Sequence, residues 1–370
     1  MIRPQSSPDE FPPGTLLSLN RALLIAAAWL ALGVAGLVFL KNFQVVARLL
    51  FPLSSLFSVA LTAVGLTAVV QNPQIAVQPI GLPDLPFHLR LDPLAAFFIM
   101  LLGAASAGIS IFAAGYFRRA EGTPPGLLCL EYHVFLASML LVLMADDAYV
   151  FMVMWETMAL SSFFLVTTNH RIPEIRRAGF LYILVAHIGA IAILLCFGVL
   201  QANTGDYTFA NMRVQSQSLL SPFWASAAFL LGLFGFGAKA GILPLHIWLP
   251  EAHPAAPSPV SALMSGVMLK TAVYGLLRVS LENPSRIAAK ARPRAGDPPG
   301  RCRVVQWLRT RDPRAQQSLL QPRGSGHQVR GQPAPCRHAA GNRAGVTPYG
   351  ARAQHRLLGH ARPETGGRRR

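Results

Sequence analysis

Eight long apolar runs constrain this chain more than any other feature. A helix needs about 20 apolar residues to cross the hydrocarbon core of a bilayer, and each run approaches or exceeds that length with few or no charges. Hydrophobic residues make up 52% of the 370 residues and charged residues only 13%, which is too apolar for a soluble domain. We therefore predict an all-α polytopic membrane protein. The predicted membrane helices are Ala22–Leu40, Leu49–Val70, Leu94–Phe117, Leu127–Met144, Ala148–Thr168, Gly179–Leu200, Pro222–Pro250 and Val260–Leu277.

The net charge of +17 is concentrated in the last 88 residues. Residues 1–282 hold 14 Lys+Arg and 13 Asp+Glu, a net of +1, and the remaining +16 belongs to residues 283–370. The chain thus divides into an N-terminal segment (1–20), a transmembrane domain (21–282) and a basic Arg/Pro/Gly-rich tail (283–370). The tail has the bias of GC-rich coding DNA translated out of frame, and a genuine disordered basic tail is the alternative. We therefore expect no nucleic-acid partner despite the charge.

The basic residues between the runs give a modest preference for one orientation. Cytoplasmic loops of membrane proteins carry an excess of Lys and Arg. Seven basic residues fall on one predicted side and five on the other, which favours the first side as cytoplasmic. The first set is Lys41, Arg48, Arg118, Arg119, Arg171, Arg176 and Arg177, and the second is Arg3, Arg21, Arg90, Arg213 and Arg278.

Glu156 is an acidic residue placed deep in a predicted membrane helix. At 1.5 Å per residue it lies about 12 Å from Ala148 and about 17 Å from Thr167. A charge at the bilayer centre costs roughly 2.5–3.5 kcal/mol on insertion scales, so such residues usually have a functional role or a partner. Asp147 stands at the entrance of the same helix and is a second candidate for an acidic path. The alternative for Glu156 is a neutral, hydrogen-bonded carboxyl.

Lys239 lies in a run that is too long to be one straight helix. The 29 residues Pro222–Pro250 would extend about 43 Å, against a hydrocarbon core of about 30 Å. Glycines surround Lys239 and Pro244 follows it, which is the pattern of a broken helix beside a transport site. The alternative is that Lys239 ends a shorter helix and extends its amine to the interface.

Lys270 and three histidines complete the set of candidate proton carriers. Lys270 lies about 16 Å after Pro259 along the next helix, too deep for the amine to reach the interface easily, and a buried lysine can exchange a proton near neutral pH. His187 is deep in its own run, where a packing role is the alternative. His246 and His253 flank a proline-rich linker between the two lysine helices, as relays or interface residues, and Glu251 between them is expected to be wet.

The chain carries no recognisable signature of bond-making catalysis. Residues 1–282 contain no phosphate-binding glycine loop, haem-attachment motif or nucleophile elbow, and the four cysteines lack metal-ligand spacing. One acid and two lysines in membrane helices suit the movement of protons or cations better.

Two stretches resemble a known family. Residues 234–274 (FGFGAKAGILPLHIWLPEAHPAAPSPVSALMSGVMLKTAVY) and residues 146–166 (DDAYVFMVMWETMALSSFFLV) are similar to the proton-translocating, antiporter-like membrane subunits of respiratory complex I and membrane-bound hydrogenases. Together with RRAGFLYILVAHIGA, they are most similar to the hydrogenase-4 and formate hydrogenlyase branch. The resemblance covers roughly residues 20–280.

The resemblance implies roles for three of the candidates. Glu156 and Lys239 would form the charged pair of the family, Lys239 would be the central lysine in the broken seventh helix, and Lys270 would pass the proton laterally from the eighth. Such subunits have about fourteen helices in two inverted repeats, the first formed by helices four to eight. Six helices, the second repeat and its exit lysine would then be missing here.

The resemblance also implies partners and a location. The family's subunits bind no redox cofactor, and Fe–S clusters, with nickel–iron in hydrogenases, belong to a peripheral redox arm. We expect a non-redox subunit of the bacterial inner membrane, in contact with the lipid bilayer and other membrane subunits, moving protons or Na⁺. The alternatives are a stand-alone cation/proton antiporter subunit or a non-functional truncated product. A soluble basic binding module is a further alternative, but only the basic tail supports it.

Overall fold

Nearly all of the structured part of the chain is helical. The computed structural model describes residues 17–82, 85–117, 123–201, 207–218 and 221–282. The predicted tail and most of the N-terminal segment lie outside the described residues. The α-helices are α1 (Leu17–Val38), α2 (Phe43–Val45), α3 (Phe51–Ala68), α4 (Pro93–Tyr116), α5 (Pro125–Met144), α6 (Ala148–Val166), α7 (Pro173–Gln201), α8 (Phe209–Ser218), α9 (Pro222–Ala240), α10 (Leu249–Ala255), α11 (Ser258–Leu263) and α12 (Leu269–Glu282).

Eight stretches of the described chain are long and apolar enough to cross a membrane, so the predicted number of membrane helices is confirmed. Each overlaps one predicted run. The spans are Leu17–Val38, Phe43–Ala68, Pro93–Tyr116, Pro125–Met144, Ala148–Val166, Pro173–Gln201, Pro222–Ala255 and Ser258–Ser280. Two of them contain π-helical turns, Val46–Leu50 before α3 and Met264–Met268 between α11 and α12.

The seventh span is broken, as predicted. Helix α9 ends at Gly241, whose φ of +73° lies in the left-handed region that glycine adopts without strain. The chain then passes through a 3₁₀ turn at Leu245–Trp248 into α10. The Trp248 indole donates a hydrogen bond to the Ala238 carbonyl (2.8 Å), which satisfies a backbone acceptor near the break. This is how irregular backbone is tolerated at membrane depth.

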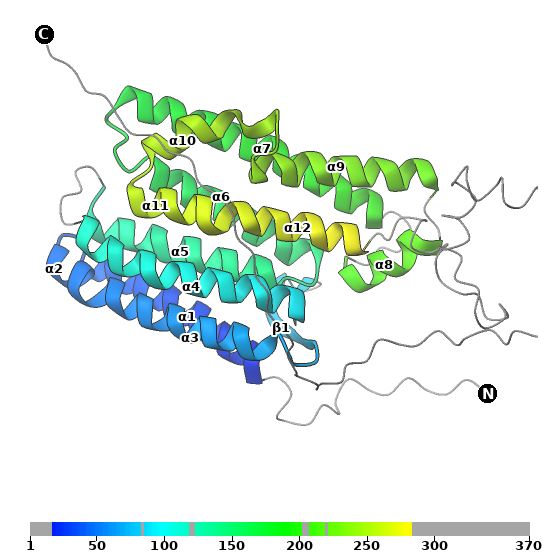
Figure 1. The fold of residues 1–370 in the computed structure, drawn as a ribbon, viewed down its shortest axis with the longest axis horizontal. Helices are drawn as coiled ribbons and strands as arrows, with labels where there is room; N and C mark the ends of the chain where they lie inside the picture. Colours follow the sequence, from blue (N-terminus) through cyan, green and yellow to red (C-terminus); the bar gives the residue numbers. More distant parts are fainter. Residues whose placement is uncertain (1–16, 83–84, 118–122, 202–206, 219–220, 283–370) are drawn as a thin grey trace, which may run out of the picture. The chain divides into compact units, whose positions relative to one another are not determined.

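The helices lie side by side and cross closely at glycines. Figure 1 shows α3 beside α4 and α9 near α12 and α7, in agreement with the contacts between these elements. A Cβ added at Gly103 of α4 would meet the Thr62 backbone of α3 at 2.6 Å. Likewise, a Cβ at Gly235 of α9 would meet the Gly189 carbonyl of α7 at 2.6 Å. Small residues allow such close packing where lipid provides no hydrophobic driving force.

The fourth span, α5, is the most enclosed span. Within its most apolar window 72% of the residues are buried, against 39–50% for the other seven spans. It is also the span interrupted by Glu131 and His133. His133 is fully buried against neighbouring helices, whereas Glu131 is half-buried.

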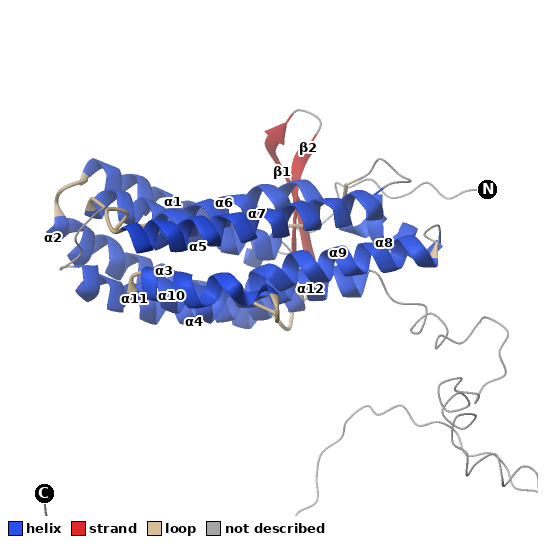
Figure 2. Ribbon diagram, turned by 90° about the horizontal axis from the view of Figure 1, so that it is seen from above, coloured by secondary structure: helices blue, strands red, loops and turns tan. Residues whose placement is uncertain are grey.

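A β-hairpin between α3 and α4 was not predicted. Strand β1 (Gln74–Leu82) pairs antiparallel with β2 (Leu85–Leu91), with Val77 opposite His88 and an irregularity between Gln78 and Gly81. Figure 2 shows the hairpin extending away from the helices. Its base contacts the α5–α6 connection, because Leu89 forms an isolated bridge with Ala145. The hairpin therefore carries His88 and Arg90 to one end of the helices.

Candidate functional site

The amine of Lys239 is buried and bound to a tyrosine hydroxyl. Lys239 lies in the last turn of α9 and is only 3% exposed. Its Nζ donates to the Tyr182 hydroxyl of α7 at 2.7 Å, and it stands 4.9 Å from the centre of the same ring. A lysine with this burial does not reach the interface, so the alternative of a surface-seeking amine does not apply.

The Tyr182 hydroxyl connects Lys239 to α6. It lies 2.5 Å from the Ser162 Oγ and 3.7 Å from the Met268 Sδ. The Ser162 Oγ is also 2.6 Å from the Met158 carbonyl, which can only accept a hydrogen bond. When Ser162 donates to that carbonyl, Tyr182 donates to Ser162 and Lys239 donates to Tyr182. The result is a directed chain of hydrogen bonds from α9 through α7 to α6.

Glu156 pairs with His187 rather than with Lys239. The Glu156 Oε2 lies 3.8 Å from the His187 Nε2, and the two side chains are 33% and 49% exposed. The His187 Nδ1 is 3.1 Å from the Ile183 carbonyl, so Nδ1 carries the proton and Nε2 faces the carboxyl. Within the described residues, no contact of ion-pair length joins Glu156 and Lys239, so the charged pair that the resemblance implies is not formed in this structure.

Helix α7 brings the two halves of this arrangement together. His187 and Tyr182 are five residues apart, a rise of about 7.5 Å, and they contact Glu156 and Lys239 respectively. Glu156 and Lys239 therefore each contact α7, at positions five residues apart, and among the described residues no ion pair joins them to each other.

Lys270 lies apart from these residues. It is exposed, and its Nζ donates to the Ser265 carbonyl in the adjoining π-helical turn. The Ser265 Oγ in turn donates to the Ser261 carbonyl (3.0 Å), and the Ser261 Oγ lies 2.9 Å from the His253 Nδ1. Hydrogen bonds thus lead along the eighth span from His253 toward Lys270, in part through backbone carbonyls.

The other sequence candidates are placed as follows. His253 is half-buried, Glu251 is exposed as expected, and the His246 Nδ1 is buried without a hydrogen-bond partner among the described residues.

Asp147 caps α6 by accepting from the Val150 amide (2.6 Å), and it binds both the amide (2.9 Å) and the Nδ1 (3.2 Å) of His88. Burial raises the pKa of Asp147 despite these bonds. Its carboxyl is thus engaged in joining the hairpin to α6.

A charged cluster at the same end was missed by the sequence reasoning. Arg278 of α12 is 4% exposed and donates to both carboxyl oxygens of Asp92 (2.5 and 3.2 Å) and to the Tyr274 hydroxyl (2.6 Å). Burial opposes ionisation of Asp92, but the hydrogen bond and charge of Arg278 outweigh it and lower the pKa of this carboxyl. The sequence shows an aspartate and an arginine near the ends of two membrane spans, but it does not show that these two ends lie next to each other.

No metal centre is indicated in the part of the chain that the structure describes, since no three His, Cys, Asp or Glu side chains converge there. The candidate site consists of the buried Lys239–Tyr182–Ser162 chain and the half-open Glu156–His187 pair.

The membrane helices of this chain are similar in sequence to those of known proteins. Residues 145–290 match the family described as NADH:quinone oxidoreductase/Mrp antiporter, transmembrane. Hydrogenase-4 component B of Escherichia coli K12 is 44% identical over 194 residues, 52% of this chain and 28% of that protein. Formate hydrogenlyase subunit 3 of the same organism is 30% identical over 197 residues, 53% of this chain and 30% of that protein. The chain thus spans less than a third of the length of these relatives.

Solved structures show the same fold. A chain of the membrane-bound sulfane sulfur reductase, an archaeal respiratory membrane complex, superposes with a TM-score of 0.61 at 23% identity, over 73% of this chain and 42% of that chain. A chain of the Mrp complex from Dietzia sp. DQ12-45-1b gives 0.57 at 26% identity, over 73% and 28%. With eight apolar spans and this domain, the protein is an integral membrane protein.

Proposed function

We propose that this chain, which carries in residues 145–290 the membrane domain of NADH:quinone oxidoreductases and Mrp antiporters, moves protons as a subunit of a redox-driven complex of the hydrogenase-4 or formate hydrogenlyase type. The observation that carries the proposal is the buried Lys239 beside the helix break, bound through Tyr182 to Ser162. An ammonium in that position is costly, and ionisable residues inside membrane spans usually mark transport pathways.

The proposed mechanism couples two charges across α7. A carboxylate at Glu156 favours a proton on His187 and positive charge nearby, while its neutralisation weakens that effect. The change reaches Lys239, which then releases its proton along its hydroxyl contacts or toward the linker histidines. Proton transfer continues from His253 along Ser261 to Lys270, with water completing the gaps. The chain itself contributes no electron transfer.

The partners follow from the same proposal. Other membrane subunits would cover the half-open Glu156–His187 pair and the exposed Lys270, and a peripheral arm with Fe–S clusters, and nickel–iron in a hydrogenase, would provide the redox energy. We place the complex in the bacterial cell membrane, because the relatives named above with this sequence similarity are bacterial.

The test uses everted vesicles from cells that produce the chain with its partner subunits. We expect Lys239→Met and Lys270→Ala each to reduce substrate-driven proton uptake by about tenfold or more, since a proton carrier is lost. Oxidation of the substrate by the partner subunits should remain largely intact. Normal uptake in the Lys239→Met vesicles would reject the proposal, as would wild-type vesicles that pump nothing, which is the outcome expected of a non-functional product.

A stand-alone cation/proton antiporter is the second candidate, favoured by the structural likeness to the Mrp complex. The two functions differ in what drives the protons. An antiporter dissipates an imposed pH gradient when Na⁺ is added without any redox substrate, whereas the redox subunit responds only to substrate. The same vesicles, energised either by an acid jump or by substrate, distinguish the two.

A further inference from the structure

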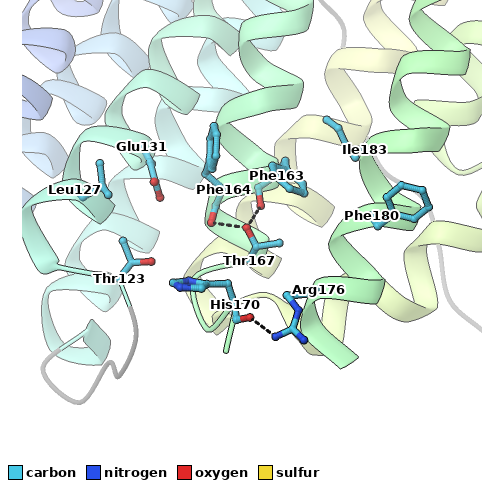
Figure 3. Close-up of a pocket in the computed structure, with 10 residues that line it drawn as sticks. All are labelled: Thr123, Leu127, Glu131, Phe163, Phe164, Thr167, His170, Arg176, Phe180 and Ile183. Carbon is cyan, nitrogen blue, oxygen red and sulfur yellow. Dashed lines mark hydrogen bonds between the residues drawn. The ribbon is translucent and has the colours of Figure 1, made fainter. Parts of the chain in front are cut away.

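A pocket lies between α5, α6 and α7 at the end of the helices opposite the hairpin. Its volume is about 490 Å³, and most of its wall is apolar, with Leu127, Phe163, Phe164 and Phe180 among the lining side chains (Figure 3). Three titratable or charged groups also face it: Glu131 from α5, His170 from the α6–α7 connection and Arg176 from α7. The residues assigned above to the proton path do not line this pocket.

Glu131 is the unusual member of this wall. Its Oε2 is buried and finds no hydrogen-bond partner among the described residues. In Figure 3 the carboxyl points toward the end of the pocket where Thr123 and His170 lie. Acidic residues inside membrane spans are usually paired or functional, and a lone carboxylate against apolar side chains is costly unless it takes up a proton.

The neighbouring cation does not neutralise Glu131. The Arg176 guanidinium donates to the carbonyls of His170 (2.9 Å) and Arg171 (3.0 Å), which holds it at the mouth of the pocket. No ion pair joins Arg176 to Glu131 within the described residues. The charge of Arg176 is thus fixed at the surface end, and Glu131 lies deeper with an open acceptor.

The pocket leads toward the Glu156–His187 pair along one face of each helix. On α7 the lining residues Arg176, Phe180 and Ile183 are spaced by four and three residues, and His187 follows four residues later on the same face. On α6 the same spacing of four, three and four residues connects Thr167, Phe163, Leu160 and Glu156, so these residues also share one face. The two faces meet where Glu156 contacts His187, one helical turn, or about 6 Å, beyond Ile183.

We propose that this pocket is the proton-uptake site for the Glu156–His187 pair, and that Glu131 is the carboxyl that takes up the proton. The inference deepens the proposed function and rests on it. Hydronium or a protonated buffer at the mouth gives a proton to the Glu131 carboxylate and leaves water or the buffer base behind. The proton then crosses the turn at Leu160 and Ile183 through water to the Nε2 of His187 or to the Glu156 carboxylate. Orientation by basic residues places the mouth on the cytoplasmic side, where Arg171, Arg176 and Arg177 lie.

The first test examines the site without requiring transport. Dicyclohexylcarbodiimide is apolar and reacts with protonated carboxyls in apolar surroundings to give a stable N-acylurea. In membranes containing the protein, we expect peptide mass mapping to find this adduct on Glu131, with a yield that rises as pH falls. Glu131→Gln should remove that adduct and Glu174→Gln, which deletes an exposed carboxyl on the same loop side, should not. No adduct on Glu131 at any pH would overturn the proposal.

The second test examines uptake in everted vesicles of the assembled complex. Glu131→Gln should slow substrate-driven proton uptake by about tenfold and Glu131→Asp should restore part of it, while Glu174→Gln matches the wild type. Unchanged uptake in Glu131→Gln would overturn the inference. If Lys239→Met also has normal uptake, the proposed function itself fails. If only Lys239→Met is impaired, the proposed function stands without this entry site.

Discussion

At the scale of single residues, the structure separates proton-exchanging groups from structural ions. Lys239 is surrounded by protein, and the Tyr182 hydroxyl accepts a hydrogen bond from its amine. Arg278 is equally buried, but a bidentate contact with Asp92 neutralises its charge. A group that exchanges protons needs a partner that can both accept and donate, and a hydroxyl satisfies this requirement whereas a carboxylate salt bridge holds its charge in place.

Tyr182→Phe tests the hydroxyl contact of Lys239. The phenyl ring keeps the packing and the face that lies 4.9 Å from the amine, but the acceptor at 2.7 Å is lost. We expect substrate-driven proton uptake to fall by about tenfold, with little change in the thermal unfolding midpoint. Tyr149→Phe on α6 is the control, because Tyr149 packs against Phe87 away from this chain. Equal uptake in the two variants would show that the hydroxyl has no part in transport.

Asp92→Asn tests the salt bridge and its pH dependence. Without the carboxylate, Arg278 stays buried but loses its ion pair with residue 92. We expect this loss to lower the free energy of unfolding by about 3 kcal/mol near neutral pH. Because the folded pKa of Asp92 is lowered from its ordinary 3.8, its contribution is complete above that value and is lost as pH falls through the folded pKa. In detergent, the thermal unfolding midpoint should therefore fall less in the variant than in the wild type as the pH is lowered from neutral to acidic. Parallel curves would contradict this assignment.

At the scale of elements, the sequence predicts the spans but not what joins them. Each long apolar run overlaps a membrane span, and the glycines beside Lys239 correctly indicated the break. The hairpin was missed because its first strand includes Pro79 and leaves several apolar side chains exposed, so no clear alternation marks it. The Lys239–Tyr182 contact could not be predicted either, since it depends on how closely α7 approaches α9.

Gly235→Ala tests that approach. The added methyl would lie 2.6 Å from the Gly189 carbonyl and from the Ile193 side chain, so α9 must move away from α7. We expect a destabilisation of about 1–3 kcal/mol and a loss of proton uptake as Lys239 leaves Tyr182. Gly198→Ala on α7 meets nothing within 4 Å and should stabilise by about 0.5–1 kcal/mol. Thermal unfolding of both variants measures the difference, and equal midpoints would argue against close packing at Gly235.

At the scale of the whole molecule, charges are sorted to the two ends of the helices. At one end, His88 of the hairpin is bound to Asp147. Arg90 of the hairpin lies close to Asp92, which also binds Arg278. The other end has the α6–α7 connection with Arg171, Arg176 and Arg177, whose exposed side chains have few acidic neighbours in sequence. The basic residues at the hairpin end are largely paired, so the unpaired positive charge lies at the α6–α7 end. The orientation itself depends on the count of Lys and Arg on each side, which favours the α6–α7 end as cytoplasmic.

The orientation decides the direction of proton uptake, and two cysteine variants determine it. We expect Glu174→Cys, beside Arg176 and Arg177, to react with a membrane-impermeant maleimide in everted vesicles and to be protected in intact cells. Ile80→Cys in the hairpin, 62% exposed in the wild type, should react in intact cells instead. The physical reason is that short loops with an excess of Lys and Arg stay on the cytoplasmic side. In that orientation the Glu131 pocket opens to the cytoplasm, from which a redox-driven pump must take its protons. The reverse labelling pattern would place the pocket on the outside and make it an exit for protons.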